Sequence, residues 1–277
     1  MGRLIAVVLF IALIAPAGFL ARGWSHASGR RAVAAAAVAF VPATSTAAAH
    51  LTRQAVHASR VRKLGFALGV ALVVTTVVLF AEASVFLWVP ALAVGLLAGV
   101  LLAEATRPRP RWTLSDPPRR PRRSEQISLW LLWTMRGTVA GEVLAAALLA
   151  HDLGAVATAI AVAVPLGGWL LAEVSLLRAL VRPLPAEGAD VPVDEAQRTW
   201  TAHLVVAAAT VLAVLPLGAL LLRAAIELGE RVASAAAGLL PVALVAGGFS
   251  ALIAGLIVAG FLVTWLRPLR QTSHALA

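Results

Sequence analysis

The sequence predicts an all-α fold, a polytopic transmembrane helix bundle, and two observations lead to this prediction. First, 61% of the 277 residues are hydrophobic and only 13% are charged, whereas a soluble domain keeps about a quarter of its residues charged. Second, the chain contains long apolar runs, and about 20 apolar residues are enough for a helix to cross the hydrocarbon core. In lipid every backbone polar group must be paired internally, and these runs are too long and unbroken for barrel strands. The chain is therefore expected to use lipid as its solvent.

Seven apolar runs are long enough to span the membrane. They lie at residues 4–21, 64–81, 84–103, 128–150, 153–172, 202–222 and 237–266. Their spacing predicts an amino-terminal helix followed by three helical hairpins. Residues 1–63 then form an amino-terminal span with a basic interfacial segment, and residues 64–277 form one membrane domain whose cytoplasmic loops are 104–127 and 173–200.

The lysine and arginine residues predict the orientation, because loops rich in these residues stay on the cytoplasmic side. With the amino terminus outside and seven alternating spans, 19 of the 23 basic residues fall inside, three fall outside, and Arg136 lies within a helix. The carboxyl terminus is then cytoplasmic, and the protein is expected in the inner, cytoplasmic membrane. The tryptophans near the same boundary are expected to form an aromatic belt. They are Trp112, Trp130, Trp133, Trp200 and Trp265.

The amino-terminal segment leaves the number of spans open. Residues 33–50 are alanine-rich and contain Pro42 and three hydroxyl side chains, so we interpret them as a helix on or near the inner face. As an eighth span they would place the amino terminus inside and give a weaker split, with 17 basic residues inside and five outside. Cleavage of a signal peptide near Ala15-Pro16-Ala17 is a third alternative.

A basic, proline-rich run fills the loop between the third and fourth spans. Such a run attracts any polyanion, including nucleic acid. Here it is bounded on both sides by spans, so anionic lipid headgroups lie closest, with about 1 kcal/mol of attraction per basic residue. We therefore expect contact with lipid or a cytoplasmic partner, and no binding of nucleic acid. The candidate contact residues are Arg107, Arg109, Arg111, Arg119, Arg120, Arg122 and Arg123.

Arg136 and Glu142 are the candidate functional residues within the spans. If their helix starts near residue 127, Arg136 lies about 13 Å along it and Glu142 lies near its middle. A lone charge at the bilayer centre costs at least about 2.5–3.5 kcal/mol, so such groups usually pair or line a pathway. Six residues apart, the two side chains diverge by roughly 120°, so each needs a partner elsewhere, or Glu142 is protonated. The alternative is that Arg136 reaches the inner surface and Glu142 is neutral or hydrogen-bonded to a neighbour.

The sequence carries no signature of an enzyme, a metal site or a cofactor site. Cysteine is absent, and the six histidines do not follow the spacing of metal ligands. His50 and His57 share one helix face with Arg53 between them, which is typical of an interfacial helix. No glycine-rich phosphate-binding loop is present. We expect neither catalysis nor a cofactor.

Two helices share a short motif. The tetrapeptide LLAE occurs at residues 101–104 and again at 170–173, near the inner ends of two predicted spans. The repetition suggests that the hairpins are related units, although membrane physics alone could produce similar helix ends. We interpret Glu104 and Glu173 as ordinary residues at helix boundaries.

Small residues recur at four-residue spacing within the spans. Such pairs permit close contact between helices. In a chain this rich in glycine and alanine they predict compact packing and say little about dimerisation. The GxxxG pairs are Gly65/Gly69, Gly95/Gly99 and Gly137/Gly141.

The chain resembles a group of uncharacterised multi-pass membrane proteins from high-GC actinobacteria. The segments that carry the resemblance are LLAEATRPRPRWTLSDPPRRPRR and LVRPLPAEGADVPVDEAQRTWTAHLVVAAA, within residues 60–220. That group has no established activity, so the resemblance implies a host and a membrane location. Some of its members are encoded beside ABC ATPases, which implies an accessory or permease-like part in an exporter.

Two functions are compatible with this sequence. The first is a non-enzymatic scaffold or accessory subunit whose basic loop meets lipid or a cytoplasmic partner. The second is a small transporter or ABC-type permease subunit with Arg136 or Glu142 on its pathway. The predicted hairpins all have the same orientation, unlike the inverted repeats of many secondary transporters. This pattern favours the scaffold.

Overall fold

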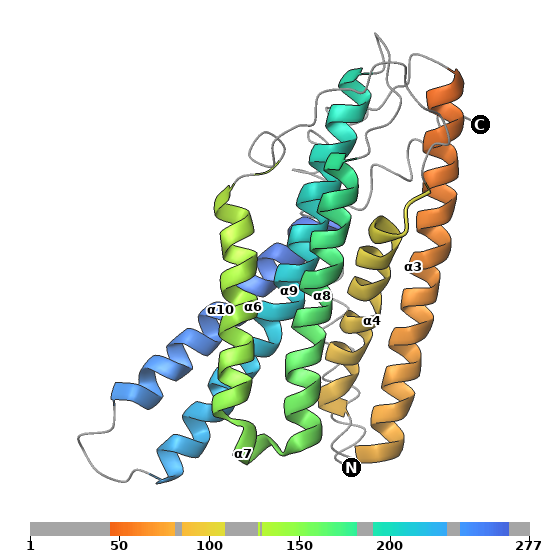
Figure 1. The fold of residues 1–277 in the computed structure, drawn as a ribbon. Coiled ribbons are helices and arrows are strands. Elements are labelled where there is room, and N and C mark those ends of the chain that lie inside the picture. Colours follow the sequence, from red (N-terminus) through yellow and green to blue (C-terminus); the bar gives the residue numbers. More distant parts are fainter. Residues whose placement is uncertain are drawn as a thin grey trace.

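The structure, a computed structural model, is all-α throughout the part of the chain that it describes (Figure 1). The described residues are 45–80, 85–108, 127, 129–181, 191–231 and 239–265. The helices are α3 (Ser45–Phe80), α4 (Val85–Ala105), α6 (Leu129–Leu148), α7 (Ala150–Leu153), α8 (Ala155–Val181), α9 (Val191–Arg231) and α10 (Leu239–Trp265). All but the four-residue α7 are at least 20 residues long.

Six of these helices are long and apolar enough to cross a membrane, so the chain is compatible with an integral membrane protein. Their candidate spans are Val56–Val78, Trp88–Ala105, Leu129–Leu148, Ala155–Ala179, Gln197–Ile226 and Leu240–Val263. They correspond to the six predicted spans that follow residue 63. The predicted first span, residues 4–21, lies outside the described residues, and the count of seven spans therefore stays a prediction.

Helix α3 begins much earlier than the predicted span at 64–81. Residues 45–50, expected to belong to a separate interfacial helix, are the first turns of α3, and Lys63 lies in its interior. The physical reason is local. Residues 45–63 contain neither glycine nor proline, so nothing in this stretch ends the helix. The rest of the expected interfacial helix, 33–44, lies outside the described residues.

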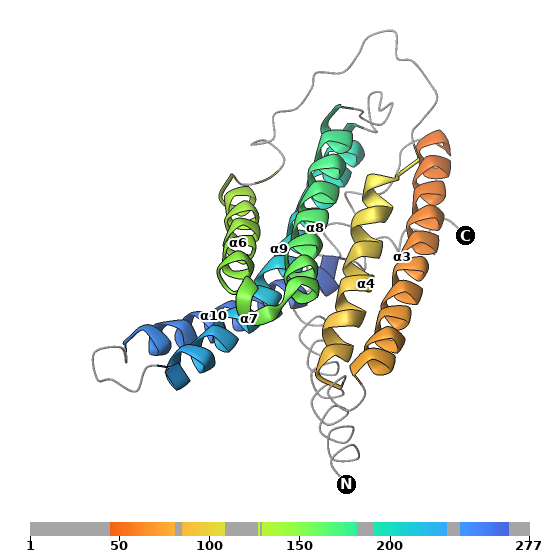
Figure 2. The same cartoon turned by 60° about the horizontal axis from the view of Figure 1, so that its bottom comes forward.

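Helix α9 is the central element of the bundle (Figures 1 and 2). In an apolar 18-residue stretch of its candidate span 72% of the residues are buried, against 11% in the corresponding stretches of α3 and α10. It packs against α4, α6, α8 and α10, and α3 packs mainly on α4. Consecutive long helices run in opposite directions and lie side by side as the pairs α3/α4, α6/α8 and α9/α10.

Small side chains allow α9 to hold this central place. Its segment 204–214 is made of alanine, valine and leucine with a single threonine, and every residue in it is buried. Alanine and valine let neighbouring backbones come close, which increases van der Waals contact, the main favourable term between helices in lipid. Leu101, Met135 and Leu176 bring α4, α6 and α8 onto this segment with at most 1% of their surface exposed.

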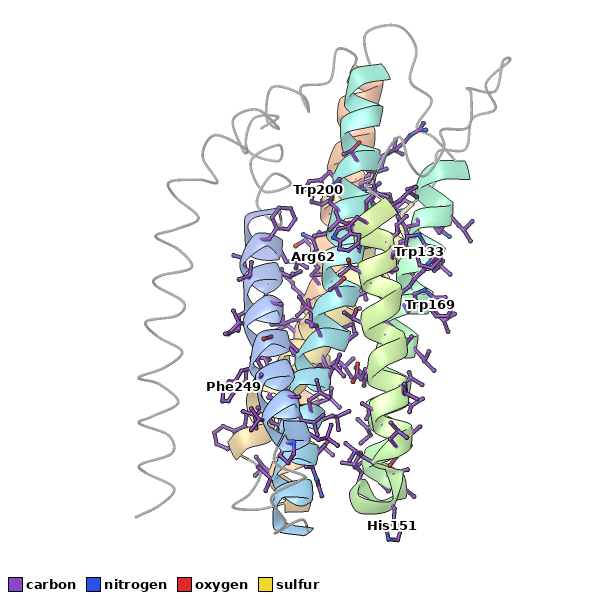
Figure 3. All side chains as sticks on the ribbon, turned by 90° about the vertical axis from the view of Figure 1, so that its left-hand side faces the viewer. Arg62, Trp133, His151, Trp169, Trp200 and Phe249 are labelled. Carbon is purple, nitrogen blue, oxygen red and sulfur yellow. The ribbon has the colours of Figure 1, made fainter. Side chains whose placement is uncertain are left out.

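The expected aromatic belt is wrong for one tryptophan. Trp130 and Trp133 on α6 are 77% and 65% exposed on the outer surface of the bundle, as a belt requires. Trp200, in contrast, is 2% exposed and belongs to the core around α9 (Figure 3). Because α9 is surrounded by other helices, its residues near the boundary face protein and not lipid. Trp112 and the side chain of Trp265 lie outside the described residues.

Two of the three GxxxG pairs pack directly against each other. Gly65 and Gly69 on α3 face Gly95 and Gly99 on α4, and backbone meets backbone at this crossing. A Cβ atom added at Gly99 would lie 2.8 Å from Cα of Gly65, which is closer than non-bonded carbon atoms approach each other in proteins. The third pair differs, because nothing lies within 4 Å of a Cβ atom at Gly137.

Candidate functional site

Arg136 forms an ion pair with Glu173, one helix away. Its Nη2 and Nε atoms donate to Oε1 of Glu173 at 2.6 and 3.1 Å, which joins α6 to α8. The guanidinium group also lies over the ring of Trp133, 5.6 Å from its centroid, in the geometry of a cation–π contact. The Arg136 side chain is 34% exposed and that of Glu173 is 16% exposed. The arginine charge within the span is thus neutralised by a neighbouring helix.

Glu142 lies on a different face of α6. It is completely buried, and neither carboxyl oxygen has a hydrogen-bond partner among the described residues. It belongs to the stripe of α6 that is buried in the bundle, composed of Leu132, Met135, Val139, Glu142 and Ala146. An ionised carboxylate without donors costs far more in apolar surroundings than the neutral acid. This packing therefore suits a protonated Glu142.

A second group of charges lies where α3, α6 and α9 begin and α4 and α8 end, which we term the charged end. Glu104, with a side chain 2% exposed, forms ion pairs with Arg107 Nη2 at 3.2 Å and with Arg62 Nη2 at 3.7 Å. The Thr201 hydroxyl lies 3.4 Å from the second carboxylate oxygen of Glu104 and donates to it. Arg178 Nη2 donates to the backbone carbonyl of Arg107 at 2.8 Å. Helices α3, α4, α8 and α9 therefore meet here through one carboxylate, three guanidinium groups and one hydroxyl group.

Polar contacts next to this group tie α3 to α4 and to α9. The Thr106 hydroxyl donates to the carbonyl of Leu102 at 2.6 Å, so it accepts from His57 Nε2, which lies 3.0 Å away. The Gln197 side chain on α9 donates to that of Gln54 on α3 at 2.5 Å, and both residues are buried. Figure 3 shows Arg62 and Trp200 towards this end and His151 at the opposite end of the bundle.

The two LLAE segments make equivalent contacts. Glu104 on α4 meets Arg62 of α3, and Glu173 on α8 meets Arg136 of α6, so each acid pairs with an arginine of the preceding long helix. Glu104 does lie at the end of its candidate span, as expected, whereas Glu173 lies six residues before the end of the span in α8, and both carboxylates form ion pairs. The repeated motif, combined with Arg136 inside one apolar run and Arg62 just before another, was the signal that could have indicated the pairs.

The candidate lipid-contact arginines fall mainly outside the described residues. Only Arg107 is described, and it pairs with Glu104 while its side chain keeps 20% of its surface exposed. Arg109, Arg111, Arg119, Arg120, Arg122 and Arg123 lie in the segment 109–126, of which nothing is described. Their contact with lipid or with a partner stays a prediction.

No group of three potential metal ligands occurs within the described helices and their short flanks. No known protein family, curated protein or solved structure matches this chain.

The Arg136–Glu173 pair is expected to be a coupled unit. Replacing Glu173 by glutamine should lower the free energy of unfolding by about 1–3 kcal/mol, because it leaves a partly buried guanidinium unpaired. The Arg136→Gln/Glu173→Gln double variant should lose less than the sum of the single changes, with a coupling of about 1 kcal/mol. Reversible unfolding in mixed micelles measures both quantities. Additive losses would show that the two side chains do not stabilise each other.

Proposed function

We propose that this protein is a non-enzymatic scaffold or accessory subunit of the cytoplasmic membrane. The observation that carries the proposal is the use of charged side chains to join helices. Arg136 and Arg62 each pair with a glutamate of a neighbouring helix. Groups fixed in this way stabilise one arrangement of helices, which is what a scaffold needs.

The proposed orientation places the charged end at the cytoplasmic surface. The basic run that contains Arg107 follows α4 at this end, and α3 and α9 extend past their candidate spans there by 11 and six residues. Loops rich in arginine stay in the cytoplasm and attract anionic headgroups. A cytoplasmic or membrane-bound partner, such as an ABC ATPase, would meet the protein on this side. The resemblance to actinobacterial proteins supports a host from that group.

A small transporter or permease subunit is the second candidate, and Glu142 favours it. A fully buried carboxyl group in the middle of a candidate span is costly to keep. Buried intramembrane acids of this kind often carry protons or ions. Arg136 is less suited to such a pathway, because Glu173 already neutralises it.

Site-specific photo-crosslinking in cells tests the scaffold. A photoreactive residue replaces Arg53, which is exposed at the charged end, or His151, which is exposed at the other end. The proposal predicts a discrete protein adduct from position 53 and none from position 151. Adducts at neither position, or the same adducts at both, would exclude a partner at the charged end.

Proton flux separates the two candidates. The protein is reconstituted into vesicles that contain a pH-sensitive dye, and the internal pH is followed after an external pH jump. A scaffold should behave like protein-free vesicles, both as wild type and as Glu142→Gln. If the wild type conducts protons and a folded Glu142→Gln variant does not, Glu142 lies on a transport pathway and the scaffold proposal fails.

A further inference from the structure

Glu104 pairs with two arginines, so its carboxylate balances only one of their charges. Arg62 lies 3.7 Å from one carboxylate oxygen and Arg107 lies 3.2 Å from the other, which leaves one positive charge in excess among these three side chains. The side chains of Arg62 and Arg107 are only 22% and 20% exposed, so water screens them incompletely. Partly buried like charges repel each other unless an anion lies between or beside them.

Arg62 has donor capacity that the described residues leave unused. Its Nε and Nη2 atoms are buried and make no hydrogen bond there. Its distance to Glu104, 3.7 Å, is that of an ion pair and too long for a hydrogen bond. Glu104 is already occupied at its other oxygen by Arg107 and Thr201. An acceptor other than the described residues would complete the hydrogen bonding of Arg62.

The depth of the group limits what this acceptor can be. Glu104 is the penultimate residue of the candidate span of α4, and Arg107 lies two residues beyond the end of that span. Residues at the end of a span lie at the level of the lipid headgroups, which arginine reaches readily. Phosphate oxygens at this level match the planar donor pattern of the guanidinium group, often through two parallel hydrogen bonds.

We propose that Arg62 and Arg107, which pair with opposite oxygens of Glu104, form a binding site for a phosphate group. The headgroup of an anionic phospholipid such as phosphatidylglycerol supplies this chemistry, and inorganic phosphate supplies it from solution. The site uses residues of α3 and α4 that join the helices and does not involve the loop 109–126. It requires the end of a span at a membrane surface, but neither the scaffold nor the permease function.

Lipid titration of the purified protein tests the site. The full-length chain in a neutral detergent is titrated with phosphatidylglycerol, and bound lipid is counted by native mass spectrometry. A neutral galactolipid without phosphate serves as the comparison. We expect saturable binding of phosphatidylglycerol and about tenfold weaker binding after Arg62→Gln, the change that corresponds to about 1.4 kcal/mol.

Arg60→Gln is the matched control for this experiment. Arg60 lies two residues away on α3, is exposed, and loses the same charge on substitution. Its variant should bind phosphatidylglycerol within about twofold of the wild type. If Arg62→Gln fails to fold, Arg107→Gln tests the same site, and its binding should weaken by a similar factor. Unchanged affinity in the folded Arg62 or Arg107 variant, or an equal loss in Arg60→Gln, would overturn the proposal.

Competition identifies the source of the phosphate. If inorganic phosphate raises the unfolding temperature of the wild type but not of Arg62→Gln, and also displaces the lipid, the site binds phosphate from solution. If only phosphatidylglycerol stabilises the wild type, the site binds a headgroup. If the galactolipid binds as tightly as phosphatidylglycerol, the site does not recognise phosphate from either source. None of these outcomes depends on crosslinking at position 53 or on proton flux, so the function and the site can fail separately.

Discussion

Replacing Gly95 by alanine is expected to lower the free energy of unfolding by about 1–3 kcal/mol, the usual effect of overfilling a closely packed contact. The added methyl group would meet the backbone nitrogen and Cα of Gly69 and would lie 2.7 Å from the carbonyl oxygen of Gly65. A flexible side chain could move aside, but here the obstacle is the backbone of α3. The two helices must therefore separate along the whole crossing, and contacts between neighbouring residues are lost as well.

Gly137→Ala provides the control for this prediction. Gly137 also lies inside a candidate span, but nothing lies within 4 Å of the added Cβ atom. Alanine favours the helix over glycine by about 0.5–1 kcal/mol, so this variant should be as stable as the wild type or slightly more stable. Unfolding of both variants in mixed micelles measures the difference. Equal stabilities would show that the α3–α4 crossing is not closely packed.

The helices could be predicted from the sequence because hydrophobicity is a local property. The predicted spans 84–103 and 153–172 begin within two residues of α4 and α8, where apolar runs follow polar or glycine-containing segments. The beginning of α3 could not be predicted in the same way. Its first turns are polar. When a helix continues beyond the lipid, hydropathy does not change at the residue where the helix begins.

The contacts between charged residues could be predicted only in part. The divergence of Arg136 and Glu142 on one helix follows from helical geometry, and it indicated that Arg136 needs a partner on another element. That this partner is Glu173 depends on which helices are neighbours and at what height they cross. The same holds for Trp200, whose burial follows from the central position of α9 and not from its own segment.

Glu104→Gln is expected to be among the most destabilising single changes at the charged end. Removing one partner of a buried ion pair typically costs about 3–5 kcal/mol. Because the two arginines keep about a fifth of their side-chain surface exposed, we expect roughly 3 kcal/mol in unfolding experiments. Glu173→Gln should cost less, since Glu173 is more exposed than Glu104. A Glu104→Gln variant as stable as the wild type would show that the carboxylate does not hold the arginines.

The same substitution should have the opposite effect on phosphate binding. Without the Glu104 carboxylate, a bound phosphate no longer competes with it for Arg62 and Arg107, and the excess positive charge increases by one. Phosphatidylglycerol should therefore bind Glu104→Gln more tightly than the wild type and should restore part of its lost stability, whereas a neutral galactolipid should restore none. A ligand that binds only the folded state stabilises it in proportion to the logarithm of its concentration over its Kd, so the restored stability should grow with added lipid. Glu173→Gln, which leaves the Arg62–Arg107 group intact, should show no such increase. If phosphatidylglycerol stabilises the two variants equally, the lipid acts on the bundle as a whole and not through the arginines around Glu104.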